Sequence, residues 1–126
     1  MSTVPVQVET LSGRALDWAT GEAERRQIMI SSRGEILHAD RALGDYDEWA
    51  PSRRWDQAGP LIDAWRISFA TLGTGPRGAN GHEPIVALAT SRALPAETHL
   101  IAACRAIVAS VFGDTVQIPR RLTDDQ

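Results

Sequence analysis

The pattern of apolar and polar positions along the chain predicts a mixture of strands and helices. Residues 4–8 carry valine at every second position, which is the period of a half-buried strand. Pro5 lacks a backbone N–H group, so we expect this strand at a sheet edge or at a strand start. Residues 27–31 and 35–38 are apolar stretches on either side of a short polar turn, Ser32-Arg33-Gly34, and this arrangement predicts a β-hairpin.

Three further segments carry the signals of helices. Residues 12–26 have Ser12 as a candidate N-cap and apolar side chains on one face, although Gly21 is unfavourable inside a helix. A short helix is expected over residues 60–65, because proline is favoured at the first helical position. The clearest amphipathic stripe lies in residues 95–112, and its apolar members are Leu100, Ala103, Cys104, Ile107, Val108 and Val111.

The remaining segments predict short strands joined by loops. We expect strands around residues 67–69, over residues 84–90 and around residues 116–118, because these segments alternate or are apolar almost throughout. The acidic stretch 39–52 has no period and is predicted to be an exposed loop. Helices and hairpins follow one another without repeats, so we predict an α+β fold with a mostly antiparallel sheet.

Length and composition fit one domain with a core of its own. The chain has 126 residues, of which 43% are hydrophobic and 23% are charged. We assign residues 1–119 to a single domain and expect residues 120–126 to be a flexible C-terminal tail. One cysteine, no long apolar run and no signal-peptide layout predict a cytoplasmic protein with no membrane segment, no metal and no cofactor.

The charge pattern ranks nucleic acid low among the partners. All 13 basic residues are arginines, and 16 acidic residues bring the net charge to −3. A net acidic chain argues against a general nucleic-acid coat, because that mode of binding must neutralise many phosphates. The pairs Arg53-Arg54 and Arg120-Arg121 leave room for a local arginine patch.

Three segments of the chain resemble, in order, the signature blocks of one family. They are Gly13-Arg14-Ala15-Leu16-Asp17-Trp18-Ala19, Trp55-Asp56-Gln57-Ala58-Gly59-Pro60-Leu61-Ile62 and Leu100-Ile101-Ala102-Ala103-Cys104-Arg105. The chain resembles the NinX-like family, small proteins of unknown function encoded by bacteriophages and prophages, and the similarity continues as far as Pro119. Cys104 stands where members often have Met, and Arg54 stands where they often have Asp. The resemblance implies a phage or prophage origin and a location in the bacterial host cytoplasm, and it carries no catalytic residue.

The residues themselves predict no catalytic or metal site. Residues 73–78 match the pattern G-x-G-x-x-G, but a strand is expected after them where a dinucleotide site needs a helix. Cys104 lies on the apolar stripe, which is typical of a core cysteine. The three histidines lack metal-ligand spacing, and the acidic cluster Asp45-Tyr46-Asp47-Glu48 lacks the glycine of a calcium loop.

The tryptophans leave two interpretations open. Trp18 and Trp55, with Asp17, Arg54 and Gln57 beside them, would suit a recognition surface, because Trp and Arg often supply binding energy at interfaces. Alternatively, these two tryptophans close the core, because the chain has only two Phe and one Tyr to fill it.

Three hypotheses for function follow from these observations. The first is a non-enzymatic accessory protein that binds a host or phage macromolecule through Asp17, Trp18, Arg54, Trp55 and Gln57. The second is a small-molecule binder or an enzyme with a pocket between the last helix and the sheet. The third is nucleic-acid binding through arginines, which ranks last because the chain is acidic. The sequence names no partner and no oligomeric state.

Overall fold

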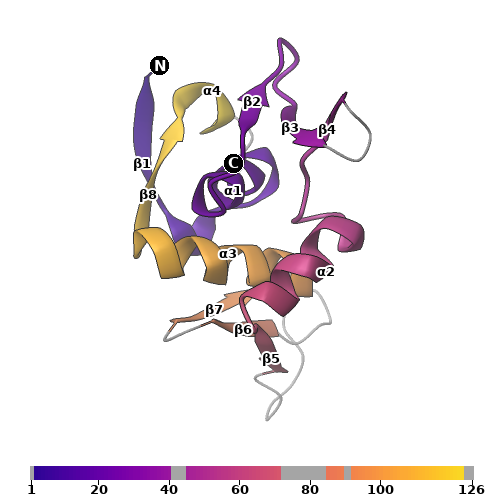
Figure 1. The fold of residues 1–126 in the computed structure, drawn as a ribbon. Coiled ribbons are helices and arrows are strands. Elements are labelled where there is room, and N and C mark those ends of the chain that lie inside the picture. The colour runs from indigo at the N-terminus through magenta and orange to yellow at the C-terminus, as the bar shows by residue number, and fades with distance from the viewer. Residues whose placement is uncertain (1, 41–44, 72–84, 90–91, 124–126) are drawn as a thin grey trace.

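Three small antiparallel sheets are arranged around two crossing helices in this chain (Figure 1). The computed structural model describes residues 2–40, 45–71, 85–89 and 92–123. Within these residues the strand orders are β1-β8, β2-β3-β4 and β5-β6-β7, and every pairing is antiparallel. The predicted α+β class with antiparallel pairing is confirmed, and the strands form three separate sheets instead of one.

Most of the predicted elements are present, with shifted ends. The strands are β1 (Thr3–Gln7), β2 (Ile28–Ile30), β3 (Ile36–Asp40), β4 (Asp45–Glu48), β5 (Ser68–Thr71), β6 (Ile85–Ala89), β7 (Arg92–Ala96) and β8 (Thr115–Pro119). The helices are a 3-10 turn η1 (Val8–Thr10), α1 (Gly13–Ala23), α2 (Trp55–Ala64), α3 (His99–Phe112) and α4 (Arg120–Thr123).

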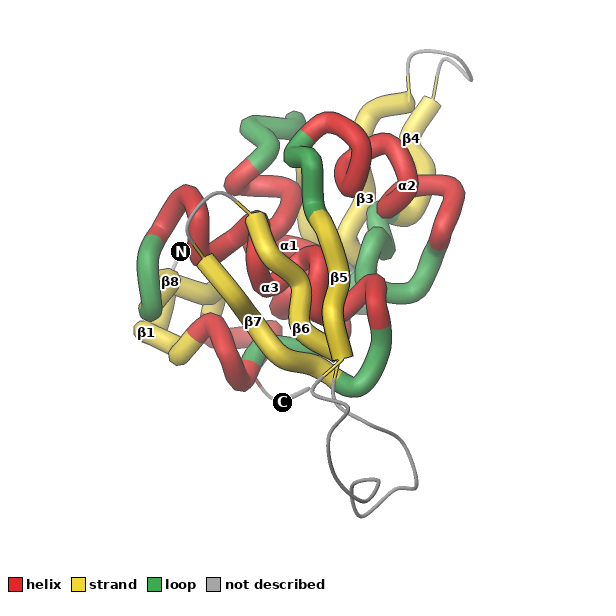
Figure 2. The backbone as a smooth tube through the Cα atoms, turned by 90° about the horizontal axis from the view of Figure 1, so that it is seen from below, coloured by secondary structure: helices red, strands yellow, loops and turns green. Residues whose placement is uncertain are grey.

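Helix α3 lies at the centre of the fold. It packs on α1 on one side and on the sheet β5-β6-β7 on the other, as Figures 1 and 2 show. Alanines at positions 102, 103, 106 and 109 are all buried, and their small side chains let both layers approach the helix closely. The predicted stripe is buried up to Val108, whereas Val111 is exposed. Arg105 fastens the helix to its neighbours, because Nε donates to the Leu11 carbonyl at 2.8 Å and Nη1 to the Pro95 carbonyl at 2.9 Å.

The helix boundaries differ from the predictions for local reasons. Helix α1 ends at Ala23 and not at residue 26, because Arg25 adopts a left-handed backbone with φ of 56°. Ser12 occupies the N-cap position of α1, but its side chain makes no capping hydrogen bond. Helix α3 begins at His99 and not at residue 95, because Pro95 belongs to β7 and Thr98 caps the helix. The Thr98 hydroxyl accepts a hydrogen bond from the Ile101 N–H at 3.1 Å.

Helix α2 begins at Trp55, five residues before the predicted start. Pro60 therefore lies inside the helix, where it has no N–H to donate to the Asp56 carbonyl. Polar side chains at the N-terminus hold this early start in place. Arg54 donates to both carboxylate oxygens of Asp56, at 3.2 and 2.7 Å.

The prediction of an exposed loop over residues 39–52 was wrong at both of its described ends, and residues 39 and 40 still belong to β3. Residues 45–48 form β4, which pairs with β3, and Trp49 directly after it is 1% exposed. Residues 41–44 lie outside the described part of the chain.

The two ends of the described chain meet in the sheet β1-β8, where Val6 pairs with Val116. Helix α4 follows β8 directly, and its Leu122 is 1% exposed. Residues 120–123 are thus packed on the fold and are not the flexible tail that the sequence predicted. Residues 124–126 lie outside the described part of the chain.

Candidate functional site

The segment 49–57, which joins β4 to α2, borders two hollows of the surface. On one side an open groove of about 570 Å³ separates it from the start of α3, and its lining includes Ser52, Trp55, Ile85, His99, Leu100 and Ile101. On the other side a polar pocket of about 200 Å³ faces β3, and its lining includes Arg26, His38, Asp47, Trp49, Asp56 and Gln57. Below, these are called the groove and the polar pocket.

The side chain of Gln57 holds the backbone conformation at the start of the segment. Its Oε1 accepts a hydrogen bond from the Ala50 N–H at 2.6 Å, and its Nε2 donates to the Glu48 carbonyl, also at 2.6 Å. The first bond satisfies a backbone N–H of the loop, and the second satisfies the carbonyl of the last residue of β4, to which Arg54 Nη1 also donates at 3.2 Å. Gln57 is therefore a structural residue of the loop, and its amide is used within the chain.

Arg54 is also engaged within the chain. Its Nη2 lies 2.7 Å from Asp56 Oδ2, and its Nη1 lies 3.4 Å from Asp47 Oδ2. The hydrogen bond from Arg54 lowers the pKa of the Asp56 carboxyl below its ordinary value, and the same contact raises the pKa of Arg54. The guanidinium thus joins β4 to the first turn of α2.

Asp17 anchors the segment from inside the protein. The residue is fully buried, its Oδ1 accepts a hydrogen bond from the Ser52 N–H at 2.9 Å, and its backbone carbonyl accepts one from Trp49 Nε1 at 2.9 Å. Asp17 Oδ2 and the Ser52 hydroxyl are buried without a hydrogen bond of standard geometry. Both ends of the segment's first half are therefore tied to one residue of α1.

Burial raises the pKa of Asp17 from 3.8 to about 6. The Ser52 N–H, the nearby Ser52 hydroxyl and the positive charge of Arg53 lower this pKa, and the negative charge of Glu48 raises it. Cys104 lies in the same region between α1 and α3. Burial, followed by the charge of Asp17, raises the pKa of the Cys104 thiol far above its ordinary value, as expected of an unreactive core cysteine.

Aromatic side chains line the groove. Trp55 is 60% exposed at its rim, although it is the first residue of α2. The ring of His99, at the start of α3, lies 6.3 Å from the Trp55 ring and 4.9 Å from the Phe69 ring, the latter in an edge-on arrangement. With Ile85, Leu100 and Ile101 the walls are mainly apolar, so the groove can bury an apolar group of a partner.

The polar pocket is organised around the buried indole of Trp49. The Arg26 guanidinium stacks on the indole at 4.2 Å, and the His38 ring lies 4.9 Å from it. Gln57 Nε2 lies 3.5 Å from His38 Nε2. Asp47 and Asp56, the two carboxylates of the pocket, already form ion pairs with Arg54 and are therefore used within the chain.

The structure brings together only some of the residues that the sequence singled out. Asp17, Arg54, Trp55 and Gln57 all meet at the segment 49–57, but of these four Trp55 alone is exposed. Asp17 is buried and is not part of a surface. Trp18 is partly buried and packs against the core, as the second interpretation of the tryptophans proposed.

Sequence reasoning missed the residues that complete the site, namely Trp49, Ser52, Phe69 and His99. The apolar triplet Trp49-Ala50-Pro51 inside a polar stretch was the available signal for a buried anchor. For His99, the signal was Thr98, because a threonine N-cap places the next residue at the exposed start of a helix.

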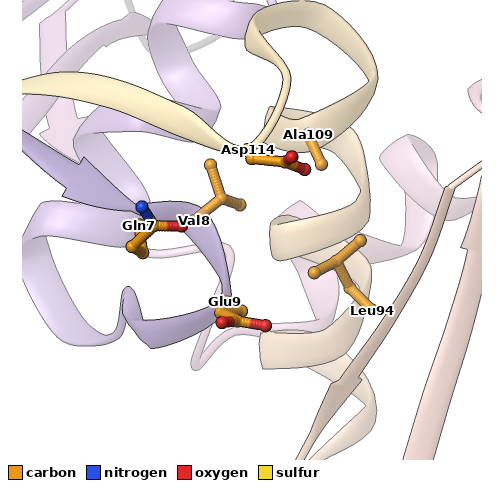
Figure 3. A pocket seen from close by; sticks show the side chains of 6 residues that line it. All are labelled: Gln7, Val8, Glu9, Leu94, Ala109 and Asp114. Carbon is orange, nitrogen blue, oxygen red and sulfur yellow. The ribbon is translucent and has the colours of Figure 1, made fainter.

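A pocket between the last helix and a sheet, predicted as the alternative site, is present but small. It has a volume of about 220 Å³, and Figure 3 shows its six lining residues, which come from the β1–η1 segment, β7, the end of α3 and the turn after it. Glu9 and Asp114 are its charged members. Ligand pockets more often have about 300–1,000 Å³, so the groove is the better candidate.

The other sequence motifs add no site within the described residues. No group of three metal-ligating side chains occurs in this part of the chain, and Asp47 and Glu48 of the acidic cluster are paired with Arg54 and Arg53. The G-x-G-x-x-G match at 73–78 lies outside the described residues. Of the helices that the structure describes, none is long and apolar enough to cross a membrane.

Fold and site together define a small α+β domain that presents an open aromatic groove beside a rigid, internally anchored loop. A comparison with protein families matches residues 7–111 to the family described as Bacteriophage P22, NinX. The chain belongs to this family of phage proteins, and the matched residues include all three signature blocks. A comparison with curated proteins found no match.

Proposed function

We propose that the chain is a non-enzymatic accessory protein of a phage or prophage that holds an apolar segment of a partner protein in the groove. The observation that carries this proposal is the 60% exposure of Trp55 at the rim of a mainly apolar groove. An exposed indole in this position has an unfavourable hydration free energy in the free protein, and a partner that covers the side chain removes this cost.

The backbone that carries the Trp55 indole is held firmly in place, and this favours a binding role for the exposed side chain. Trp55 stands on the first turn of α2, which Arg54 and Asp56 hold in place, and the preceding residues are tied to Gln57 and Asp17. A side chain on such a fixed loop loses little conformational freedom when a partner binds. Rigid aromatic anchors of this kind dominate the binding energy of many interfaces.

The shape of the groove favours a chain segment over a small molecule. The groove is open to solvent, whereas most small-molecule sites enclose their ligand. His99 and the apolar floor at Ile85 and Ile101 provide a second contact for an extended or helical segment.

Capture of partners from a lysate of the bacterial host tests the proposal. We expect Trp55→Ala to lower the amount of the captured protein partner by about tenfold or more, which corresponds to about 1.4 kcal/mol or more. Phe112→Ala is the matched control. Phe112 is another exposed aromatic residue, and it lies 41% exposed at the end of α3 that is away from the groove. Equal capture by wild type and Trp55→Ala, with both proteins folded, would falsify the proposal.

A further inference from the structure

Arginines gather around the turn of the β2–β3 hairpin, although the chain is acidic overall. Arg33 in the turn and Arg121 of α4 are exposed, and Arg14 of α1 is half-buried. Figure 1 shows α4 and this hairpin side by side at one end of the molecule, away from α2, and Arg121 bonds to the hairpin backbone. Arg14, Arg33 and Arg121 are called the arginine patch below.

Two of these arginines are oriented by the hairpin backbone. Arg14 Nη1 donates to the Arg33 carbonyl at 3.2 Å, and Arg121 Nη2 donates to the Ser31 carbonyl at 2.9 Å. Each of these bonds uses one of the five N–H groups of a guanidinium, so the other donors stay available. The patch therefore has fixed positions and free hydrogen-bonding capacity.

The arginines of the patch form no ion pair within the described part of the chain. Among the residues that the structure describes, ion pairs are formed by Arg53 and Arg54, and none is formed by Arg14, Arg33 or Arg121. Glu35, an acidic residue beside the turn, has its carboxylate 3.4 Å from the Ser31 hydroxyl. An anion arriving at the turn thus meets guanidinium groups that form no ion pair with the described residues.

The turn is ordered before any ligand arrives. The Ser31 hydroxyl accepts hydrogen bonds from the Arg33 N–H at 3.2 Å and from the Glu35 N–H at 3.1 Å. Gly34 supplies the left-handed backbone, with φ of 85°, that this turn requires. A rigid turn loses little entropy on binding, and this favours contacts with a regular ligand.

We propose that the arginine patch is a nucleic-acid-binding surface that holds the phosphate backbone of a duplex against the β2–β3 hairpin. The guanidinium group matches the geometry of a phosphate and binds it through two N–H groups. Guanidinium groups placed around a rigid turn favour the regular phosphate spacing of a duplex over a flexible acidic chain. This surface shares no residue with the groove, so the two proposals can fail independently.

Fluorescence anisotropy with a labelled duplex of about 20 base pairs tests the assignment. Three phosphate contacts predict that raising the salt from about 50 to about 200 mM weakens binding by about 40-fold. The double variant Arg33→Gln/Arg121→Gln should bind about tenfold more weakly at the lower salt, with a salt slope smaller by about 2. The Arg33 side chain makes no hydrogen bond within the described residues. Arg33→Gln alone should therefore give part of this loss of affinity without altering the fold.

The double variant Arg25→Gln/Arg66→Gln is the matched control, because it removes the same charge at two exposed arginines outside the patch. It should keep most of the wild-type affinity. The proposal is overturned if wild type does not bind the duplex at the lower salt, or if the two double variants lose affinity equally. It is also overturned if polyglutamate displaces the duplex as well as an equal charge of unlabelled duplex does, because the patch would then bind acidic chains in general.

Discussion

Asp17→Asn is expected to make the protein more stable at neutral pH and to remove a large part of the pH dependence of its stability. The native pKa of Asp17 is about 6, whereas its ordinary value is 3.8. The native protein therefore binds the proton more tightly than the unfolded chain does. The stabilisation from the protonated carboxyl is fully present below about pH 4 and is lost as the pH rises through about 6, which amounts to about 3 kcal/mol.

The asparagine side chain is neutral, as the protonated carboxyl is, and it can make the same hydrogen bonds at this site. Its amide oxygen can still accept the hydrogen bond of the Ser52 N–H, which Oδ1 accepts at 2.9 Å in the wild type. Its amide NH₂ takes the place of Oδ2 and can donate a hydrogen bond to the Ser52 hydroxyl. Both buried atoms that lack a hydrogen bond of standard geometry in the wild type, Asp17 Oδ2 and the Ser52 hydroxyl, are then accounted for.

Denaturant unfolding between pH 4 and 8 measures this effect. The stability of wild type relative to Asp17→Asn should fall across the interval from about pH 4 to about pH 6 and stay level above it. Asp63→Asn, on the exposed face of α2, controls for the change in net charge. If the wild-type and Asp17→Asn curves run parallel over the whole range, Asp17 does not titrate as its surroundings predict.

Gly21→Ala should destabilise the protein, although alanine is the better helix former by about 1 kcal/mol. A Cβ at this position would lie 2.9 Å from Ile28 Cδ1 and 3.1 Å from Trp49 Nε1, closer than side-chain atoms normally approach. Trp49 Nε1 is also the donor to the Asp17 carbonyl, so the indole cannot move away without weakening that bond. Overpacking of this kind costs about 1–3 kcal/mol.

Gly59→Ala is the matched control for Gly21→Ala. Gly59 also lies inside a helix, but nothing is within 4 Å of a Cβ built there, so the variant should gain about 0.5–1 kcal/mol. Because the gain in helix propensity is common to both, we expect the two variants to differ by the overpacking cost, about 1–3 kcal/mol in the free energy of unfolding, measured by denaturant titration. Equal effects of the two substitutions would show that Gly21 is not needed for the approach of Trp49 to α1.

Elements with a regular apolar period could be predicted from the sequence, and elements that depend on distant partners could not. The stripe of α3 and the β2–β3 hairpin carry their own local signals, and both are present. Trp49 belongs to no regular apolar period, and the short apolar triplet around it does not say what it packs on. It is buried because Gly21 leaves room for its ring and because Asp17 accepts its N–H, and both residues are far away in the sequence.

The same distinction holds for the candidate site. The sequence left Trp55 open between a recognition surface and the core, and the structure places it 60% exposed at the rim of the groove. Asp17, Arg54 and Gln57 are polar residues close to it in the same blocks, but each one bonds to other parts of the chain. Sequence alone could not separate a polar side chain that meets a partner from one that holds a loop, because both uses require the same residue types.

Site-specific photocrosslinking tests the central claim most directly, namely that the groove holds a segment of a partner protein. A photoreactive p-benzoylphenylalanine would replace His99 at the groove and, in a separate control protein, Phe112 at the other end of α3. Illuminated in host lysate, the protein with the probe at position 99 should form one protein adduct that the control does not form. Unlabelled wild type should suppress this adduct, and unlabelled Trp55→Ala should not. Adducts of equal yield from both positions, or equal suppression by wild type and Trp55→Ala, would contradict the account.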